Sequence, residues 1–175
     1  MMKYSWLPIL AALVACTEGQ GQIDVTETHE ASFPGLAADS PLRAMMGSTS
    51  SAETTIHVDA RSYLSSIGDV GTMNLSVTKN EITGSDLSFL QHLTVTIAAT
   101  DGTIPERMLS DVDVPPDAHT LDLPLLIPAA DLLNYLKEGP ISLQLIGTGT
   151  LPPQEITVTH SLEAHVTVEV HHNLI

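Results

Sequence analysis

The sequence predicts an all-β protein: an antiparallel β-sandwich of immunoglobulin-like or jelly-roll type, with one short helix near residues 128–138. Three observations support this fold class. Thr, Ser, Val, Ile and Leu dominate the composition, and most of these side chains favour strands. About eight segments alternate apolar and polar residues between turn signals rich in Gly, Pro and Asp. Only residues 128–138 combine helical spacing with helix end signals.

Turn signals separate the predicted strands. Pro34-Gly35 would stop the first strand, and Asp101-Gly102 is a favoured hairpin pair. Lys79-Asn80-Glu81 and Gly84-Ser85-Asp86 are also predicted as turns, and residues 36–52 as a loop or one short helical turn. The strands predicted before the helix are residues 22–26 with an extension towards 33, 55–60, 72–78, 92–99, 108–109 with 112–114, and 120–125.

The helix has a start signal and a stop signal. Pro128 stands near its first turn, and Asp131 lies close to the positive end of its dipole. Gly139-Pro140 terminates it, because glycine suits the end of a helix and proline cannot continue one. Just before it, Pro124 cannot donate a ladder hydrogen bond. We therefore expect the segment 120–125 to be an edge strand or to end early.

The last strand, residues 156–170, has the longest alternation in the chain and follows a strand predicted at residues 141–145. A sustained period of two with one polar face places one side on a core and the other in water. We expect a bend or bulge in it, because strands are usually far shorter, and we expect it to pair with the first strand. His160 and His165 fall on opposite faces, so without a bulge they cannot share a ligand site.

The start of the chain has the features of a secretory signal. Lys3 supplies a small positive charge, and the apolar run from Trp6 to Val14 is well short of the ~20 residues that span a membrane. Leu13-Val14-Ala15-Cys16 resembles a bacterial lipobox. The resemblance implies cleavage between Ala15 and Cys16 and acylation of Cys16. The alternatives are an ordinary signal peptide that contains a cysteine, and a buried free thiol.

The lipobox resemblance also implies how the chain is organised. Residues 1–15 would be a removed signal peptide, 16–21 a lipidated tether, 22–170 the β-sandwich domain and 171–175 a tail. The protein would be exported to the cell envelope, with the lipid bilayer as its partner through acylated Cys16. Thr17 rather than an aspartate follows the cysteine, which favours the outer membrane. Several acyl chains, at ~0.8 kcal/mol per buried methylene, would anchor it firmly.

Composition limits the classes of partner. The chain has 21 acidic and 6 basic residues and a formal net charge of −15. Such a surface repels nucleic acid and anionic headgroups, so we expect no nucleic-acid partner. Aromatic residues are 3% of the chain, which disfavours a carbohydrate-stacking surface. Cys16 is the only cysteine, so a folded domain of this chain must be stabilised by packing rather than by an internal disulfide.

Three short motifs give a second resemblance. They are Ser32-Phe33-Pro34-Gly35, Asp86 to Leu90 running into Leu93 to Ile97, and Asp131 to Leu136 before the closing strands. By these motifs, most of residues 22–170 resembles a loosely defined group of uncharacterised bacterial lipoproteins with an immunoglobulin-like or jelly-roll sandwich. The close of the chain is also similar to the late-embryogenesis-abundant type 2 sandwich. Neither resemblance implies catalytic residues.

Few residues point to chemistry. Asp111, Asp113 and Asp117 form the densest acidic cluster, and calcium favours oxygen ligands at alternate positions. The glycine and closing glutamate of an EF-hand loop are missing, so a solvated acidic loop is the favoured interpretation. His171-His172 could bind a metal weakly but is better explained as a polar tail. His57 is expected to point to solvent. The sequence contains no His-Glu-x-x-His or Gly-x-Ser-x-Gly motif, and no cofactor is expected.

These observations favour a non-catalytic envelope lipoprotein whose sandwich has a binding or structural role, with an envelope protein as its partner. Two alternatives stay open at this point. One is a divalent-cation-binding module that uses the acidic loops. The other is an accessory hydrolase whose site lies in the loops at residues 36–52 and 100–118.

Overall fold

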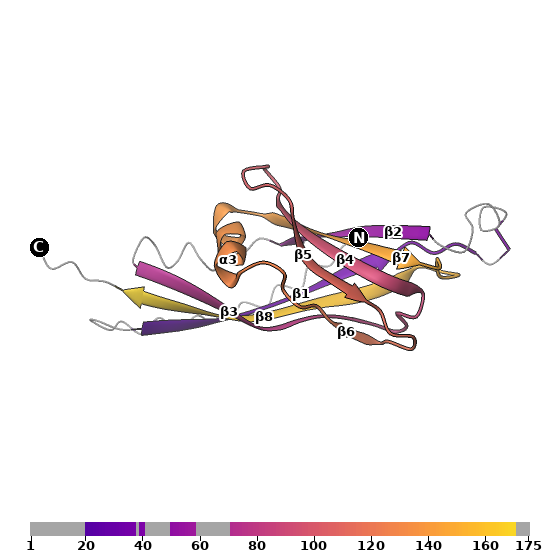
Figure 1. Ribbon diagram of the computed structural model, residues 1–175, viewed down its shortest axis with the longest axis horizontal. Helices are drawn as coiled ribbons and strands as arrows, with labels where there is room; N and C mark the ends of the chain where they lie inside the picture. Colours follow the sequence, from indigo (N-terminus) through magenta and orange to yellow (C-terminus); the bar gives the residue numbers. More distant parts are fainter. Residues whose placement is uncertain (1–19, 38, 41–49, 59–70, 171–175) are drawn as a thin grey trace, which may run out of the picture.

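The structure, a computed structural model, describes residues 20–37, 39–40, 50–58 and 71–170 (Figure 1). The predicted signal peptide with Cys16, most of the segment 36–52, and the tail with His171-His172 lie outside these residues.

Within the described residues, eight strands form two four-stranded antiparallel sheets. The long sheet has the order β1-β8-β3-β6, and the short sheet has the order β2-β7-β4-β5. The elements are β1 Gln20–Phe33, β2 Ser50–Val58, β3 Gly71–Gly84, β4 Leu90–Ala99, β5 Arg107–Asp113, β6 Thr120–Asp122, α3 Ala129–Glu138, β7 Ile141–Gly149 and β8 Ile156–Val170.

The strand order is that of a jelly roll. Consecutive strands change sheets at every step except β4 to β5, which are neighbours in the short sheet. In an immunoglobulin sandwich the first strand pairs with the second, whereas here β1 pairs with β8. The predicted all-β antiparallel sandwich with one short helix is therefore confirmed, and of its two variants the strand order matches the jelly roll.

Strand β8 lies at the centre of the long sheet. It pairs with β1 from Gln20↔Glu169 to Phe33↔Ile156, which confirms the predicted pairing of the first and last strands. On its other side it pairs with β3 over nearly the same length. Figure 1 shows these strands running side by side. The inner face of β8 is buried as its parity predicts, with Val158, Ala164 and Val166 at most 3% exposed.

The turn predicted at Lys79-Asn80-Glu81 is wrong, because β3 continues through it to Gly84. The register of β3 against β8 shifts between Val77 and Lys79, and this bulge at Thr78 exchanges the two faces of the strand. Lys79 stays outside, with its Nζ 2.8 Å from a Glu81 carboxylate oxygen, while Asn80 turns into the core. The bulge that the sequence predicts in the last strand therefore lies in its partner β3 instead, and the ladder of β8 with β1 is regular.

Helix α3 has the predicted position and ends. Pro128 precedes it, Asp131 is in its first turn and Lys137 in its last turn, and Gly139 follows it. Its buried side chains are Leu132, Leu133, Tyr135 and Leu136. Two contacts tie it to the start of β5 and the loop before it: Arg107 Nη1 donates to Asp131 Oδ2 at 2.7 Å, and the Tyr135 hydroxyl donates to the Pro105 carbonyl.

Other strand limits differ by a few residues from the sequence predictions. β2 begins at Ser50 rather than Thr55, and β7 continues to Gly149. β6 is a three-residue edge strand, as Pro124 predicted. At the Pro34-Gly35 stop, β1 ends at Phe33, a fully buried side chain in edge-to-face contact with Phe89 at 5.6 Å between ring centroids.

Gly35 offers a test of packing where β1 ends. A Cβ added there would lie 2.0 Å from the backbone carbonyl carbon of Gln154, which cannot move aside like a side chain. We expect Gly35→Ala to lower the free energy of unfolding by about 3 kcal/mol. A Cβ at Gly102 meets nothing within 4 Å but has φ of +74°, so Gly102→Ala should cost only about 1 kcal/mol. Urea unfolding measures both, and equal losses would contradict the packing at Gly35.

Candidate functional site

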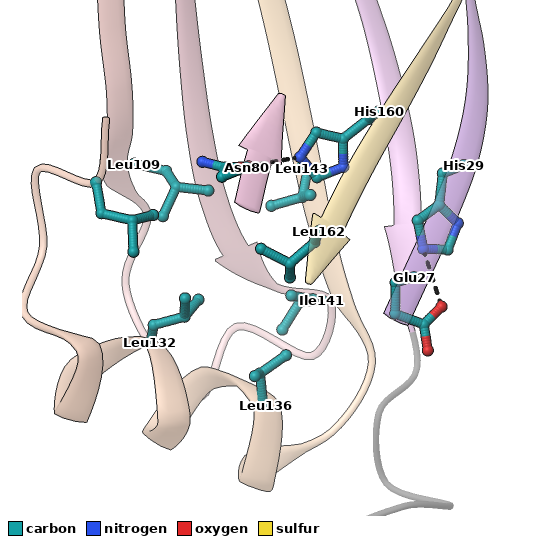
Figure 2. A pocket seen from close by; sticks show the side chains of 11 residues that line it. Glu27, His29, Asn80, Leu109, Leu132, Leu136, Ile141, Leu143, His160 and Leu162 are labelled. Carbon is teal, nitrogen blue, oxygen red and sulfur yellow. Dashed lines mark hydrogen bonds and ion pairs between the residues drawn. The ribbon is translucent and has the colours of Figure 1, made fainter. Parts of the chain in front are cut away.

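The inner face of the long sheet carries a polar cluster within an apolar core. It consists of Glu27 and His29 on β1, His160 on β8 and Asn80 on β3, and we refer to it as the histidine cluster (Figure 2). The register places His29 directly beside His160 and both Glu27 and Asn80 beside Leu162, one row of inner residues away. Asn80 belongs to this face only because of the bulge at Thr78.

His160 is held in one orientation by Asn80. Its side chain is 2% exposed, and its Nε2 lies 2.8 Å from Asn80 Oδ1. The Asn80 amide nitrogen donates to the Leu123 carbonyl at 2.8 Å, so Oδ1 is the atom that faces the imidazole. We therefore assign the neutral ring a proton on Nε2, which it donates to Asn80. His160 Nδ1 is then a bare acceptor, and it has no hydrogen-bond partner within the described part of the chain.

Glu27 and His29 point inward from an edge strand. His29 Nε2 lies 3.3 Å from Glu27 Oε2, an ion-pair distance, but the same nitrogen makes no hydrogen bond with the described residues. The angle between the two groups therefore does not fit a hydrogen bond, and we regard the interaction of His29 with Glu27 as electrostatic only. Inward charges on an edge strand disfavour the addition of a foreign strand, which gives these two residues a structural role of their own.

The histidine cluster forms one wall of a cavity of about 20 Å³. This is room for about one water molecule. The facing walls are apolar, with Leu132 and Leu136 from α3 and Ile141 and Leu143 from β7 (Figure 2). Organic ligands need pockets of several hundred Å³, so this cavity does not fit a substrate.

Burial controls the protonation of His160. Burial in the first place, and the charge of His29 to a smaller degree, lower the pKa of His160 from 6.5 to about 4. The ring is therefore neutral near pH 7. A neutral imidazole with a free Nδ1 is a base, but among the described residues no Ser, Thr or Cys side chain lines the cavity with it as a nucleophile.

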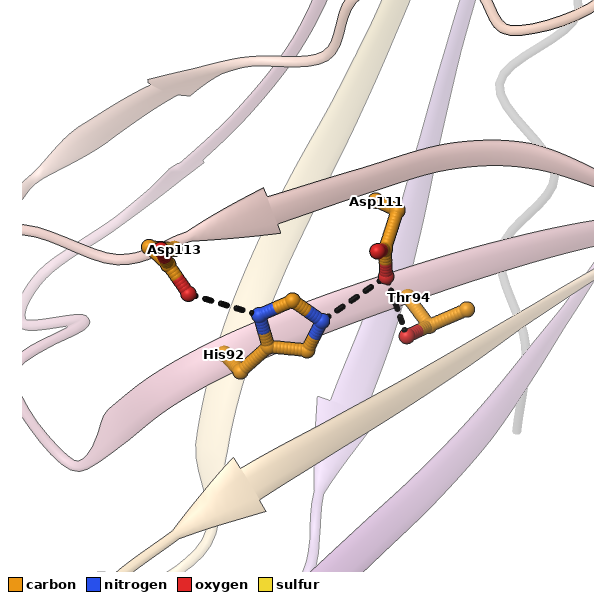
Figure 3. Close-up of polar contacts among 4 residues, drawn as sticks. All are labelled: His92, Thr94, Asp111 and Asp113. Atoms are coloured by element: carbon orange, nitrogen blue, oxygen red, sulfur yellow. Dashed lines mark hydrogen bonds and ion pairs between the residues drawn. The ribbon is translucent and has the colours of Figure 1, made fainter.

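A second cluster lies on the outer surface of the short sheet (Figure 3). His92 on β4 lies between two aspartates of β5, with Nδ1 2.9 Å from Asp113 Oδ1 and Nε2 2.7 Å from Asp111 Oδ1. Thr94 donates its hydroxyl to the same Asp111 oxygen at 2.8 Å. Because both ring nitrogens face carboxylates, both contacts are hydrogen bonds only when His92 is protonated.

These contacts shift the pKa values of the surface cluster in opposite directions. Hydrogen bonds to Asp113 and then to Asp111 raise the pKa of His92 above 6.5. The Thr94 hydroxyl, followed by His92, lowers the pKa of the Asp111 carboxyl. The three charged side chains are exposed or nearly so, so we interpret the cluster as a surface link between β4 and edge strand β5.

The predicted acidic cluster is only partly assembled. Asp111 and Asp113 meet at His92, whereas Asp117 lies in the following turn with φ of 65°. No group of three or more His, Cys, Asp or Glu side chains close enough to hold a metal ion occurs in the described ranges. His57 is exposed, and His165 lies on the opposite face of β8 from His160, as predicted. Cys16 and His171-His172 lie outside the described residues.

Sequence reasoning missed both clusters. The parity of β8 predicts His160 on the core face, but the polar run Lys79-Asn80-Glu81 favours a turn and so conceals Asn80 as the partner of His160. The pairing of β4 with β5 would have placed His92 opposite Asp113, since both strands were predicted.

Within the described part of the chain, no helix is long and apolar enough to cross a membrane.

Comparisons with known proteins give a distant likeness of shape. No protein-family model matches the chain, and no curated protein matches it. It is similar to the VP2 subviral particle of infectious bursal disease virus (16% identity, TM-score 0.36) over 93% of this chain and 37% of that one. It is also similar to the Gx strain of the same virus (14%, 0.32; 95% and 41% covered) and to mud crab tombus-like virus (8%, 0.30; 93% and 96%).

The chain therefore spans about two fifths of the first two viral chains that it resembles. All three TM-scores are far below 0.5. The likeness carries no argument about this protein, and the jelly-roll assignment rests on the strand order alone.

The Asn80 contacts can be tested by truncation. Asn80→Ala removes the acceptor of His160 Nε2–H and the donor to the Leu123 carbonyl, and leaves both partners buried. We expect a loss of about 2–3 kcal/mol in the free energy of unfolding. Asn74→Ala, on the exposed face of the same strand, should stay within about 0.5 kcal/mol of wild type. Thermal or urea unfolding distinguishes them, and a neutral Asn80→Ala would refute the proposed contacts.

His92 makes stability depend on pH. Because its folded pKa is raised, its contribution is fully present below pH 6.5 and is lost as the pH rises through the folded pKa. The free energy of unfolding should therefore fall more between pH 6 and pH 9 in wild type than in His92→Gln. The exposed His57→Gln variant serves as the control and should keep the wild-type dependence. Parallel profiles for wild type and His92→Gln would argue against the link.

Proposed function

We propose that this chain is an exported lipoprotein, anchored in a cell-envelope membrane through acylated Cys16, whose jelly-roll domain has a binding or structural role without catalysis. The observation that carries this proposal is Leu13-Val14-Ala15-Cys16, which combines a lipobox-like sequence, an apolar run of secretory length and the only cysteine of the chain. The outer membrane is the favoured destination, because Thr17 follows the cysteine.

The proposed anchor limits how far one end of the domain can lie from the bilayer. Gln20, the first residue of β1, is four positions after Cys16, and an extended chain spans at most ~3.6 Å per residue. The Gln20 end of the long sheet would then lie within about 15 Å of the acylated residue. Because β1 runs along the full length of β8, Phe33 and the loops at residues 34–37 and 150–155 would lie at the end of the domain farther from the acylated residue, where an envelope protein could meet them.

A non-catalytic role agrees with the side chains that the fold brings together. The buried histidine cluster has a cavity for one water molecule and no nucleophile among its described lining residues. The surface cluster uses oxygens of Asp111 and Asp113 to bind His92, which disfavours the alternative of a divalent-cation module on these residues. The hydrolase alternative would need loop residues outside the described ranges.

The anchor is tested at Cys16. Mass spectrometry of the mature protein should find acyl chains on Cys16 at the new N-terminus. Cys16→Ser removes the acylated thiol, so we expect the domain to move from the membrane fraction to the soluble fraction. Thr17→Ser leaves the thiol in place and should stay with the membrane. A free thiol at Cys16, cleavage at another site, or a membrane-bound Cys16→Ser variant would overturn the proposal.

The role of the domain needs a separate experiment. The intact protein would be used to capture partners from native membranes after mild crosslinking, with the released Cys16→Ser protein as the comparison. Recovery of one specific envelope protein supports the binding role. Turnover in a hydrolase substrate screen, without a specific partner, contradicts it.

A further inference from the structure

The segment between β6 and α3 bridges the two sheets directly over the histidine cluster. We name residues 123–128 the strap. At one end, Leu123 N donates to the Asn80 carbonyl of the long sheet at 2.8 Å. Three residues later, Leu126 N donates to the Leu109 carbonyl of the short sheet at 2.9 Å. Leu125 of the strap and Leu132 and Leu136 of α3 cover the cavity into which His160 faces.

The neutral ring of His160 suits this cover, and a protonated ring does not. A proton on Nδ1 would need an acceptor, and that nitrogen is buried without one among the described residues. The groups from β5, β7, the strap and α3 that line the cavity are all apolar. His29 of β1 opposes a positive charge on His160. The Glu27 carboxylate, also from β1, lies beside His29, and Asn80 of β3 is neutral. An imidazolium here lacks the hydration it has in water.

We propose that His160 and its cover form an acid-sensitive latch, in which protonation of Nδ1 releases the strap and α3 from the sheets while the β-ladders of the sandwich stay paired. Release admits water to the imidazolium. The cover is the part of the fold that can open, because separate contacts hold it rather than a continuous ladder: the Leu123 and Leu126 backbone hydrogen bonds, the exposed Arg107–Asp131 pair and the Tyr135–Pro105 hydrogen bond. In contrast, the ladder between β1 and β8 runs over all fourteen residues of β1.

The linkage between protonation of His160 and opening of the cover determines the direction and the size of the pH effect on opening. The ring has a pKa of about 4 when covered and about 6.5 when exposed to water, so the closed state binds the proton less well than the open one. The contribution to closure is present above pH 6.5 and is lost as the pH falls towards 4. From pH 7 to pH 4 the equilibrium constant for opening should rise on the order of a hundredfold.

Hydrogen exchange of the full chain measures the opening. After correction for the pH dependence of intrinsic exchange, amides of residues 123–138 should lose on the order of a hundredfold protection from pH 7 to pH 4. Amides of β1 and β8 should keep theirs. His160→Gln cannot gain a proton and should abolish the change at residues 123–138, while exposed His57→Gln should retain it. Equal loss in the β1–β8 ladder, or an unchanged strap, would overturn the latch.

A second measurement does not depend on the folding of the His160 variant. An NMR titration of wild type should give a His160 midpoint near pH 4. Because the charge of His29 opposes protonation, His29→Gln should move the His160 midpoint upward and make the protection loss at residues 123–138 smaller. A wild-type midpoint near 6.5, or a midpoint that does not respond to His29→Gln, would refute the mechanism.

Discussion

The pairing of β8 with both β1 and β3 is the constraint on which the rest of the fold depends. It joins the start of the described domain to its end, so the long sheet closes only when nearly the whole chain is present. Non-local pairing of this kind has a high entropy cost and makes folding slow. With no disulfide to offset that cost, burial of the apolar inner faces must supply the stabilisation, and Val158, Val166 and Phe33 show how completely it does so.

One bulge changes what lies inside that core. The extra residue at Thr78 turns Asn80 inward, and the Asn80 amide then contacts both His160 and the backbone of Leu123. The polar cluster and the path of the chain over the cavity are therefore consequences of the same irregularity. Buried polar groups are tolerated when they are satisfied, and Asn80 satisfies its own groups while leaving His160 Nδ1 open.

The fold class and the helix could be predicted, because period-two alternation in β1 and β8 and the end signals around α3 are local properties of the sequence. Apart from the pairing of β1 with β8, the neighbours of each strand could not be predicted, since alternation identifies a face and not a partner. Polar residues within β3 resembled a turn because Lys79 and Glu81 do face water. His160 and Asn80 are eighty positions apart, and only the sheet register brings them together.

The histidine cluster and the surface cluster around His92 lie on different sheets of the sandwich. The pKa of His160 is lowered, whereas the pKa of His92 is raised. His92 links β4 to β5 when it carries a proton, whereas His160 fits its cavity when it has lost the proton of Nδ1. Rising pH should therefore weaken the link between β4 and β5, whereas acid should loosen the strap and α3 over the histidine cluster. Two sites of one domain would then respond to opposite changes in acidity, one at an edge strand and the other at the cover of the core.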